Sequence, residues 1–177
     1  LIQKLKEAGK KVILVNFSGS AMALLPETEN CEAIVQAWYP GEMGGRAVAD
    51  VLFGDYNPGG KLPVTFYKSN SQLPDYSDYS MKGRTYRYFD DALFPFGYGL
   101  SYTTFTYGEA QIPATAKVNE TIQINVPVTN SGKMDGDEIV QVYLKKQDDA
   151  EGPIKALRAF KRVHIPAGKT VNVTLEL

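Results

Sequence analysis

Strict alternation of apolar and polar residues near the end of the chain is the feature that most limits its fold. Over residues 122–128 apolar side chains stand at every second position, and residues 171–177 repeat the pattern. A period of two turns successive side chains to opposite faces of a β-strand, so one face is buried and the other is solvated. The pattern predicts two half-buried antiparallel strands.

Further strands are expected around these two. Residues 140–144 carry the same alternation, and the sequence Pro-Ala-Gly-Lys at 166–169 predicts a hairpin connection between strands at 158–165 and 170–177. Residues 101–177 are therefore similar to a fibronectin type III-like antiparallel β-sandwich. Such a sandwich needs about seven strands and about five are recognisable, so we expect this domain to be truncated.

The first part of the chain, residues 1–67, changes between helical and strand patterns as an α/β unit does. Residues 1–9 read as the last turns of a helix with Gly9 as its stop, so we expect the chain to be cut from something longer. Gly54 is expected to stop a second helix, and Asn57-Pro58-Gly59-Gly60 predicts a turn. The expected elements are a strand over 11–17, a strand over 33–38, a helix over 45–53 and a strand over 61–67.

Residues 68–100 lack a sustained period and are rich in Ser, Asn, Asp, Pro and aromatic residues. So many aromatic side chains offer too much apolar surface to leave in water, whereas a flexible linker is poor in them. We therefore expect an ordered connection that lies against a neighbouring domain. The aromatic residues are Tyr76, Tyr79, Tyr86, Tyr88, Phe89, Phe94, Phe96 and Tyr98.

Composition limits the classes of function. The chain of 177 residues has 19 basic and 20 acidic side chains without a dense basic cluster, so nucleic acid is not an expected partner. Cys31 is the only cysteine and His164 the only histidine, so we expect no metal site and no cofactor, and Cys31 is interpreted as an inert thiol. No apolar run approaches the roughly 20 residues that span a bilayer, so no membrane span is expected.

Three ordered motifs carry a family resemblance. They are the run from Ala33 to Phe66, GRTYRYF at 83–89, and LFPFGYGLSYTTF at 93–105. Together they closely resemble the carboxyl-terminal part of a glycoside hydrolase family 3 enzyme of the β-glucosidase or β-xylosidase kind. The resemblance implies a partial α/β sandwich over 1–67, an ordered connection over 68–100, and a fibronectin type III-like domain over 101–177. It also implies a secreted or periplasmic enzyme, with β-linked oligosaccharide as substrate.

No catalytic residue is expected within the chain. Retaining glycosidases of this kind need two carboxylates about 5 to 5.5 Å apart. The resemblance implies that the nucleophilic aspartate lies in a preceding TIM-type barrel and the acid/base glutamate upstream of residues 11–17, so the chain alone should be inactive. The acidic residues that are present are interpreted as solvated loop or helix positions: Glu27, Glu29, Glu32, Glu42, Asp50, Asp55, Asp75, Asp78, Asp90 and Asp91.

Four residues are candidate substrate-binding residues. Ser18 and Ser20 follow a predicted strand, where open α/β sheets place their ligand crevices, and they either contact sugar hydroxyls or simply form a tight turn. Arg84 and Tyr86 combine guanidinium donors with an aromatic face, which suits sugar recognition. Arg84 and Arg87 could equally pin the connection to the barrel through carboxylate pairs.

Two other classes of function are left open by the residues. A non-catalytic carbohydrate-binding or adhesion module would need an exposed aromatic platform, but the aromatics concentrate in the connection and not on the sandwich strands. A nucleotide-binding α/β protein would need a fuller phosphate loop than Gly44-Gly45. The sequence does not indicate which sugar is removed or the oligomeric state.

Overall fold

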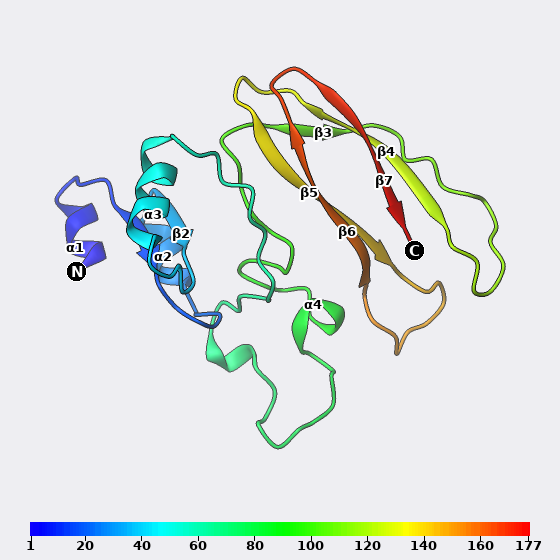
Figure 1. Cartoon of the computed structure of the whole chain (residues 1–177). Helices are drawn as coiled ribbons and strands as arrows, with labels where there is room; N and C mark the ends of the chain where they lie inside the picture. The colour runs from blue at the N-terminus through cyan, green and yellow to red at the C-terminus, as the bar shows by residue number, and fades with distance from the viewer. The chain divides into compact units, whose positions relative to one another are not determined.

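The computed structural model describes residues 1–177, whose course is drawn in Figure 1. The chain forms two compact units. One comprises Leu1–Asp55 and Pro63–Phe96, and the other comprises Tyr56–Leu62 and Gly97–Leu177. The turn at Asn57–Gly60, expected with the α/β part, thus lies in the second unit. The domain boundaries drawn from the sequence stay a prediction.

The first unit is built on a short parallel sheet. β1 (Ile13–Asn16) pairs with β2 (Ala33–Gln36) in register from Ile13 with Ala33 to Asn16 with Gln36. Both strands lie within the ranges predicted for them. The helices of this part are α1 (Ile2–Glu7), α2 (Leu25–Asn30) and α3 (Gly44–Phe53). Gly54 ends α3 with a φ of 84°, in the left-handed region that glycine reaches without strain, as predicted.

The third strand predicted over residues 61–67 is wrong. Phe66 forms an isolated bridge with Phe94, in which the Phe66 amide donates to the Phe94 carbonyl at 2.9 Å and the Leu93 amide to the Phe66 carbonyl at 2.8 Å. Pro63 has no N–H to give to a ladder, so the segment cannot pair along its whole length. Phe66 is instead used for side-chain packing.

Aromatic packing orders much of the connection. Phe66 is 1% exposed and lies edge-on between Trp38 and Phe94, at 6.1 and 6.4 Å between ring centroids. Two short helices interrupt the segment, η1 (Asn70–Gln72) and α4 (Thr85–Tyr88). Phe94 of the connection therefore packs its ring against the first unit's own core.

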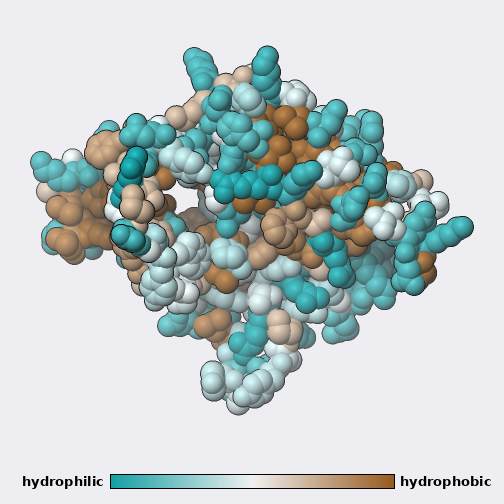
Figure 2. All heavy atoms as spheres, in the orientation of Figure 1, coloured by the Kyte–Doolittle hydropathy of each residue, from teal (hydrophilic) through white to brown (hydrophobic).

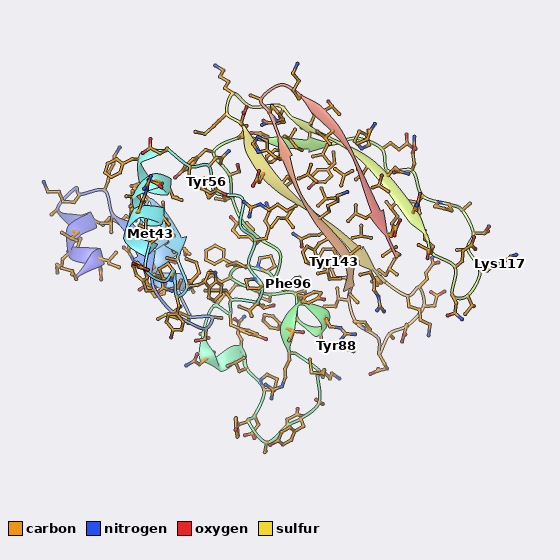
Figure 3. All side chains as sticks on the ribbon, in the orientation of Figure 1. Met43, Tyr56, Tyr88, Phe96, Lys117 and Tyr143 are labelled. Atoms are coloured by element: carbon orange, nitrogen blue, oxygen red, sulfur yellow. The ribbon has the colours of Figure 1, made fainter.

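The second unit is a β-sandwich. One sheet has the order β3-β4-β7, with β3 (Phe105–Tyr107), β4 (Gln123–Asn130) and β7 (Thr170–Glu176), and the other pairs β5 (Gly136–Leu144) with β6 (Ala156–Ile165). All pairs are antiparallel. Side chains from both sheets fill the space between them (Figure 3), and the buried core consists of Val126, Val128, Val140, Ile165, Val173 and Leu175. The half-buried strands predicted over 122–128 and 171–177 are confirmed.

The hairpin predicted at residues 166–169 is wrong. β6 and β7 belong to different sheets, so this turn carries the chain from one sheet to the other. The Lys169 amide closes it by donating to the Pro166 carbonyl at 3.0 Å. A turn between two alternating strands has the same sequence signature in both arrangements, because alternation does not specify the pairing partner.

One fully buried side chain ties the turns of the sandwich together. The Asn130 side chain is 0% exposed and donates to the carbonyls of Met134 at 2.8 Å and Ile165 at 2.9 Å. Its oxygen accepts from the Thr103 hydroxyl at 2.6 Å and the Gly132 amide at 3.1 Å. Every hydrogen-bonding position of the buried amide group is used, as burial requires.

A second polar group in the sandwich unit is an ion pair. Lys61 Nζ lies 3.2 Å from Glu138 Oε2, with the two side chains 15% and 11% exposed. Lys61 also donates to the Gly99 carbonyl at 2.9 Å, and the Tyr107 hydroxyl donates to Glu138 Oε1 at 2.8 Å. The Glu138 carboxylate therefore keeps a partner on each oxygen, and burial beside it raises the pKa of Tyr107.

Candidate functional site

The carboxyl edge of the parallel sheet carries a connected group of polar side chains. Asn16 and Gln36 are the last paired residues of β1 and β2, and Asn16 Nδ2 donates to Gln36 Oε1 at 2.6 Å. Asn16 Nδ2 and Gln36 Nε2 each donate to the Ser18 hydroxyl at 3.1 Å. Parallel strands bring their carboxyl ends to one edge, which is where open α/β sheets bind ligands. We take these residues as the candidate site.

The loop that follows β1 is held by this group. The Ser18 hydroxyl donates to the Ser20 carbonyl at 2.9 Å, and Gln36 Nε2 approaches the Ser18 carbonyl at 3.4 Å. The structure thus places both predicted serines at the sheet edge, although the hydroxyl of Ser18 is already occupied. Asn16 and Gln36 were not identified from the sequence. Their signal was a polar residue ending each of two apolar strands.

Arg84 and Tyr86 have other partners. Arg84 Nη2 donates to the backbone carbonyls of Asp75 at 2.9 Å and Asp78 at 2.8 Å, so the guanidinium closes the loop that precedes it. The Tyr86 ring stacks on Phe96 with 4.3 Å between centroids and 17° between planes. Their assignment to substrate binding stays a prediction.

The backbone between Arg84 and Tyr86 is strained. Thr85 has a φ of 54°, which is unusual for a β-branched residue, and its amide donates to the Tyr67 hydroxyl at 2.9 Å. Conformations of this kind persist where the surroundings hold them, and they concentrate at functional positions. The hydroxyl of Tyr67 and the arginine-closed loop supply that support here.

The loop between η1 and α4 projects from its unit (Figure 1). Its tip is coloured as weakly polar in Figure 2, and its tyrosines Tyr76 and Tyr79 are 93% and 89% exposed. Asp75 Oδ1 accepts from the Ser77 amide at 2.8 Å and Asp78 Oδ1 from the Ser80 amide at 2.8 Å. The loop is therefore internally braced, while its two aromatic rings remain in solvent.

Hydrogen bonds make the carboxyl groups of Asp75, Asp78 and Asp137 poor general acids. A general acid of a glycosidase needs a raised pKa. The hydrogen bonds from Ser77 and Ser80 hold the pKa of Asp75 and of Asp78 below the ordinary value, and a hydrogen bond from His164 does the same for Asp137. Such carboxylates stay ionised and act in turns or ion pairs.

Three further features of the structure concern metal binding, membrane-spanning helices and thiol reactivity. No group of three or more His, Cys, Asp or Glu side chains lies close enough to hold a metal ion. None of the helices combines the length and apolar character needed to cross a membrane. Burial raises the pKa of the Cys31 thiol, which disfavours the nucleophilic thiolate.

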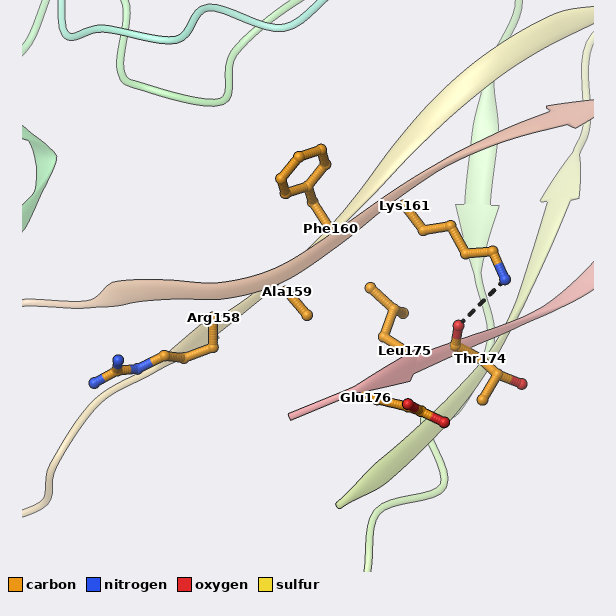
Figure 4. Close-up of a pocket in the computed structure, with 7 residues that line it drawn as sticks. All are labelled: Arg158, Ala159, Phe160, Lys161, Thr174, Leu175 and Glu176. Atoms are coloured by element: carbon orange, nitrogen blue, oxygen red, sulfur yellow. Dashed lines mark hydrogen bonds between the residues drawn. The ribbon is translucent and has the colours of Figure 1, made fainter. Parts of the chain in front are cut away.

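A groove of about 620 Å³ lies between the edge strands β6 and β7 (Figure 4). Lys161 reaches across it to the Thr174 carbonyl at 3.5 Å, while the Phe160 ring points away from the groove. Lysine on an edge strand is a common protection against pairing with another strand. The groove is therefore explained by the open sandwich edge.

Two protein-family models match the chain. The Glycosyl hydrolase family 3 C-terminal domain matches residues 1–102, and the Fibronectin type III-like domain matches residues 138–177. Both matches agree with the order of the two folds in the structure.

Named relatives match over nearly the whole chain. A "Xylan 1,4-beta-xylosidase" of Xylanibacter ruminicola is 65% identical over 99% of this chain and 20% of its own length. A "Periplasmic beta-glucosidase" of Salmonella typhimurium is 40% identical over 100% of this chain and 25% of its own length. The chain thus spans about a fifth to a quarter of the curated relatives it matches.

Solved structures share the fold of this chain. A β-glucosidase from Streptomyces venezuelae in complex with D-glucose matches with a TM-score of 0.88 and 33% identity, over 99% of this chain and 25% of that one. A β-glucosidase from Thermotoga neapolitana in complex with glucose has a TM-score of 0.86 and 32% identity, over 99% and 27% of the two chains. The predicted α/β plus fibronectin type III-like fold class is confirmed.

Proposed function

Because this chain belongs to glycosyl hydrolase family 3, we propose that it is the carboxyl-terminal part of a retaining exo-β-glycosidase. The whole enzyme removes terminal β-linked sugars from oligosaccharides, and the two catalytic carboxylates lie outside these 177 residues. The observation that carries the proposal is the 65% identity, over 99% of this chain, to a relative named a β-xylosidase. We accordingly propose terminal β-linked xylose as the preferred sugar and glucose as the alternative.

The role of this part of the enzyme is to complete and support the cleft. Asn16, Ser18 and Gln36 gather at the sheet edge where such folds bind ligands, which supports a position beside the substrate. The lowered pKa of Asp75 and of Asp78 disfavours these two residues as the general acid. Arg84 and Tyr86 are proposed to line the same substrate site from the connection.

The rest of the protein and its location are also part of the proposal. The chain packs on a preceding TIM-type barrel that carries the nucleophile. The enzyme is secreted or periplasmic, which is supported by a relative named as periplasmic.

The test compares the 177-residue chain with the longer protein that includes the barrel, using aryl β-xyloside and aryl β-glucoside. We expect chromophore release by the longer protein alone, with the larger kcat/KM for the xyloside. Hydrolysis by the short chain would place a catalytic pair within it and refute the proposal. Inactivity of both proteins would favour a non-catalytic carbohydrate-binding module.

A further inference from the structure

Tyr39 is an exposed aromatic residue at the carboxyl edge of the β1-β2 sheet. It follows the end of β2 and is 80% exposed. Its ring lies over the backbone of Gly19, because a β-carbon added to Gly19 would stand 2.5 Å from Tyr39 Cε2 and 2.9 Å from its hydroxyl oxygen. The ring therefore adjoins the Ser18–Ser20 loop and its polar group.

Glycine at position 19 lets the ring lie close to the loop backbone. The φ of Gly19 lies outside the positive range in which glycine is favoured, so the backbone alone does not require it. A β-carbon at position 19 would displace the ring, which is the exposed end of a flexible side chain.

The residues on both sides of Tyr39 are fixed. Trp38 has a φ of 54°, a strained value for a bulky residue, and its ring packs edge-on against the buried Phe66 at 6.1 Å. On the other side, a β-carbon added to Gly44 would stand 2.5 Å from Pro40 Cγ, so the Pro40 ring lies against the start of α3. The backbone is thus anchored before and after Tyr39 while its ring faces solvent.

A single exposed aromatic residue is common on protein surfaces and needs no explanation. Tyr39 differs in two ways: the residue before it is held at a cost in strain, and its ring lies against the backbone of Gly19, next to Ser18 of the candidate site. A flat aromatic ring beside a polar loop matches a pyranose, whose C–H face is apolar and whose edge carries hydroxyl groups.

We propose that Tyr39 is a sugar-binding residue that stacks on a pyranose ring of the β-linked substrate, with Asn16 and Gln36 fixing the adjoining loop. This inference rests on the proposed glycosidase function, because the stacked sugar belongs to the substrate of that enzyme. It adds to the site an aromatic surface that Ser18 and Ser20 lack. Asn16 and Gln36 act as positioning residues through Ser18.

The experiment measures kcat and KM of the longer, barrel-containing protein with aryl β-xyloside and aryl β-glucoside. Tyr39→Ala is expected to lower kcat/KM at least about tenfold on the better substrate, mainly through a higher KM. Tyr39→Phe keeps the ring and is expected to stay within about threefold of the parent protein. Inhibition by D-xylose and D-glucose provides a second readout, and Tyr39→Ala should raise the inhibition constant of the preferred sugar by a similar factor.

Phe160→Ala is the matched control, since Phe160 is 69% exposed on β6 of the sandwich. Its kinetics should be unchanged, and the thermal midpoints of all variants should agree within about 2 °C. If the parent is active and Tyr39→Ala keeps kcat/KM within twofold, or loses it together with thermal stability, the inference is overturned. If the parent protein itself is inactive, the proposed function fails first, which separates the two results.

Discussion

Replacing Asn130 by alanine should loosen the sandwich far more than its single lost amide group suggests. The substitution removes four hydrogen bonds, which join the side chain to Thr103, Gly132, Met134 and Ile165. At roughly 1 kcal/mol for each bond, the loss is about 4 kcal/mol. That amount is a large part of the stability of an ordinary domain. The full loss is expected because the four partners remain buried without replacements.

Hydrogen exchange followed by mass spectrometry measures this loss in the strands themselves. A loss of about 4 kcal/mol corresponds to nearly a thousandfold faster exchange of the most protected amides in β4 and β6. Asn172→Ala is the matched control, because Asn172 is exposed on β7 and should change exchange by about twofold or less. An acceleration below about tenfold in Asn130→Ala would refute the reasoning that these four bonds hold the sheets together.

Three further perturbations follow from the described contacts. Lys61→Met leaves Glu138 buried without its cation and should lower the free energy of unfolding by about 3 to 5 kcal/mol. The double variant Lys61→Met with Glu138→Gln should recover most of that loss. Equal losses in the single and double variants would contradict the reasoning. The hydrogen bonds from His164 and Arg162 hold the pKa of Asp137 below its ordinary value of 3.8. The stabilisation by this carboxylate is therefore present above that pH and lost as the pH falls through the folded pKa. The difference in thermal midpoint between the parent and Asp137→Asn should therefore shrink as the pH falls below the ordinary pKa of an aspartate, and a gap that widens in acid would show the opposite sign. Arg84→Gln removes the guanidinium that closes the loop at Asp75 and Asp78, so chymotrypsin should cut after Tyr76 or Tyr79 several-fold faster than in the control Arg46→Gln. Equal cleavage rates would show that the hydrogen bonds of the Asp75 and Asp78 side chains alone hold the loop.

The sandwich strands could be predicted because their pattern is local. Alternation at 122–128 and 171–177 requires one buried face, whatever the neighbouring strand is. The pairing could not be predicted in the same way. Pro166–Lys169 reads as a hairpin turn, yet it joins β6 and β7 across two sheets, since β4 takes β7 as its neighbour.

The same distinction explains the candidate site. Ser18 and Ser20 could be identified because small polar residues follow a recognisable strand. Asn16 and Gln36 come together only because β1 and β2 pair in register, which is a relation between residues distant in sequence. The close approach of Tyr39 to Gly19 likewise depends on that pairing and on the backbone of Trp38.

The failed strand at 61–67 has a physical lesson of its own. Its β-branched residues favour a strand, but Pro63 removes a donor, so backbone hydrogen bonds form only on either side of it, at Leu62 and at Phe66. Strand propensity mostly reflects fit to a half-buried surface. Phe66 meets that condition by packing between two aromatic rings without a sheet.

The most direct test of the central claim is the anomeric form of the first sugar released by the longer protein. Proton NMR during the first minutes of aryl β-xyloside hydrolysis distinguishes the two anomers before they interconvert. A retaining exo-β-glycosidase releases the β-anomer first, and the 177-residue chain alone releases none. Initial formation of the α-anomer, or sugar release by the short chain, would contradict the account.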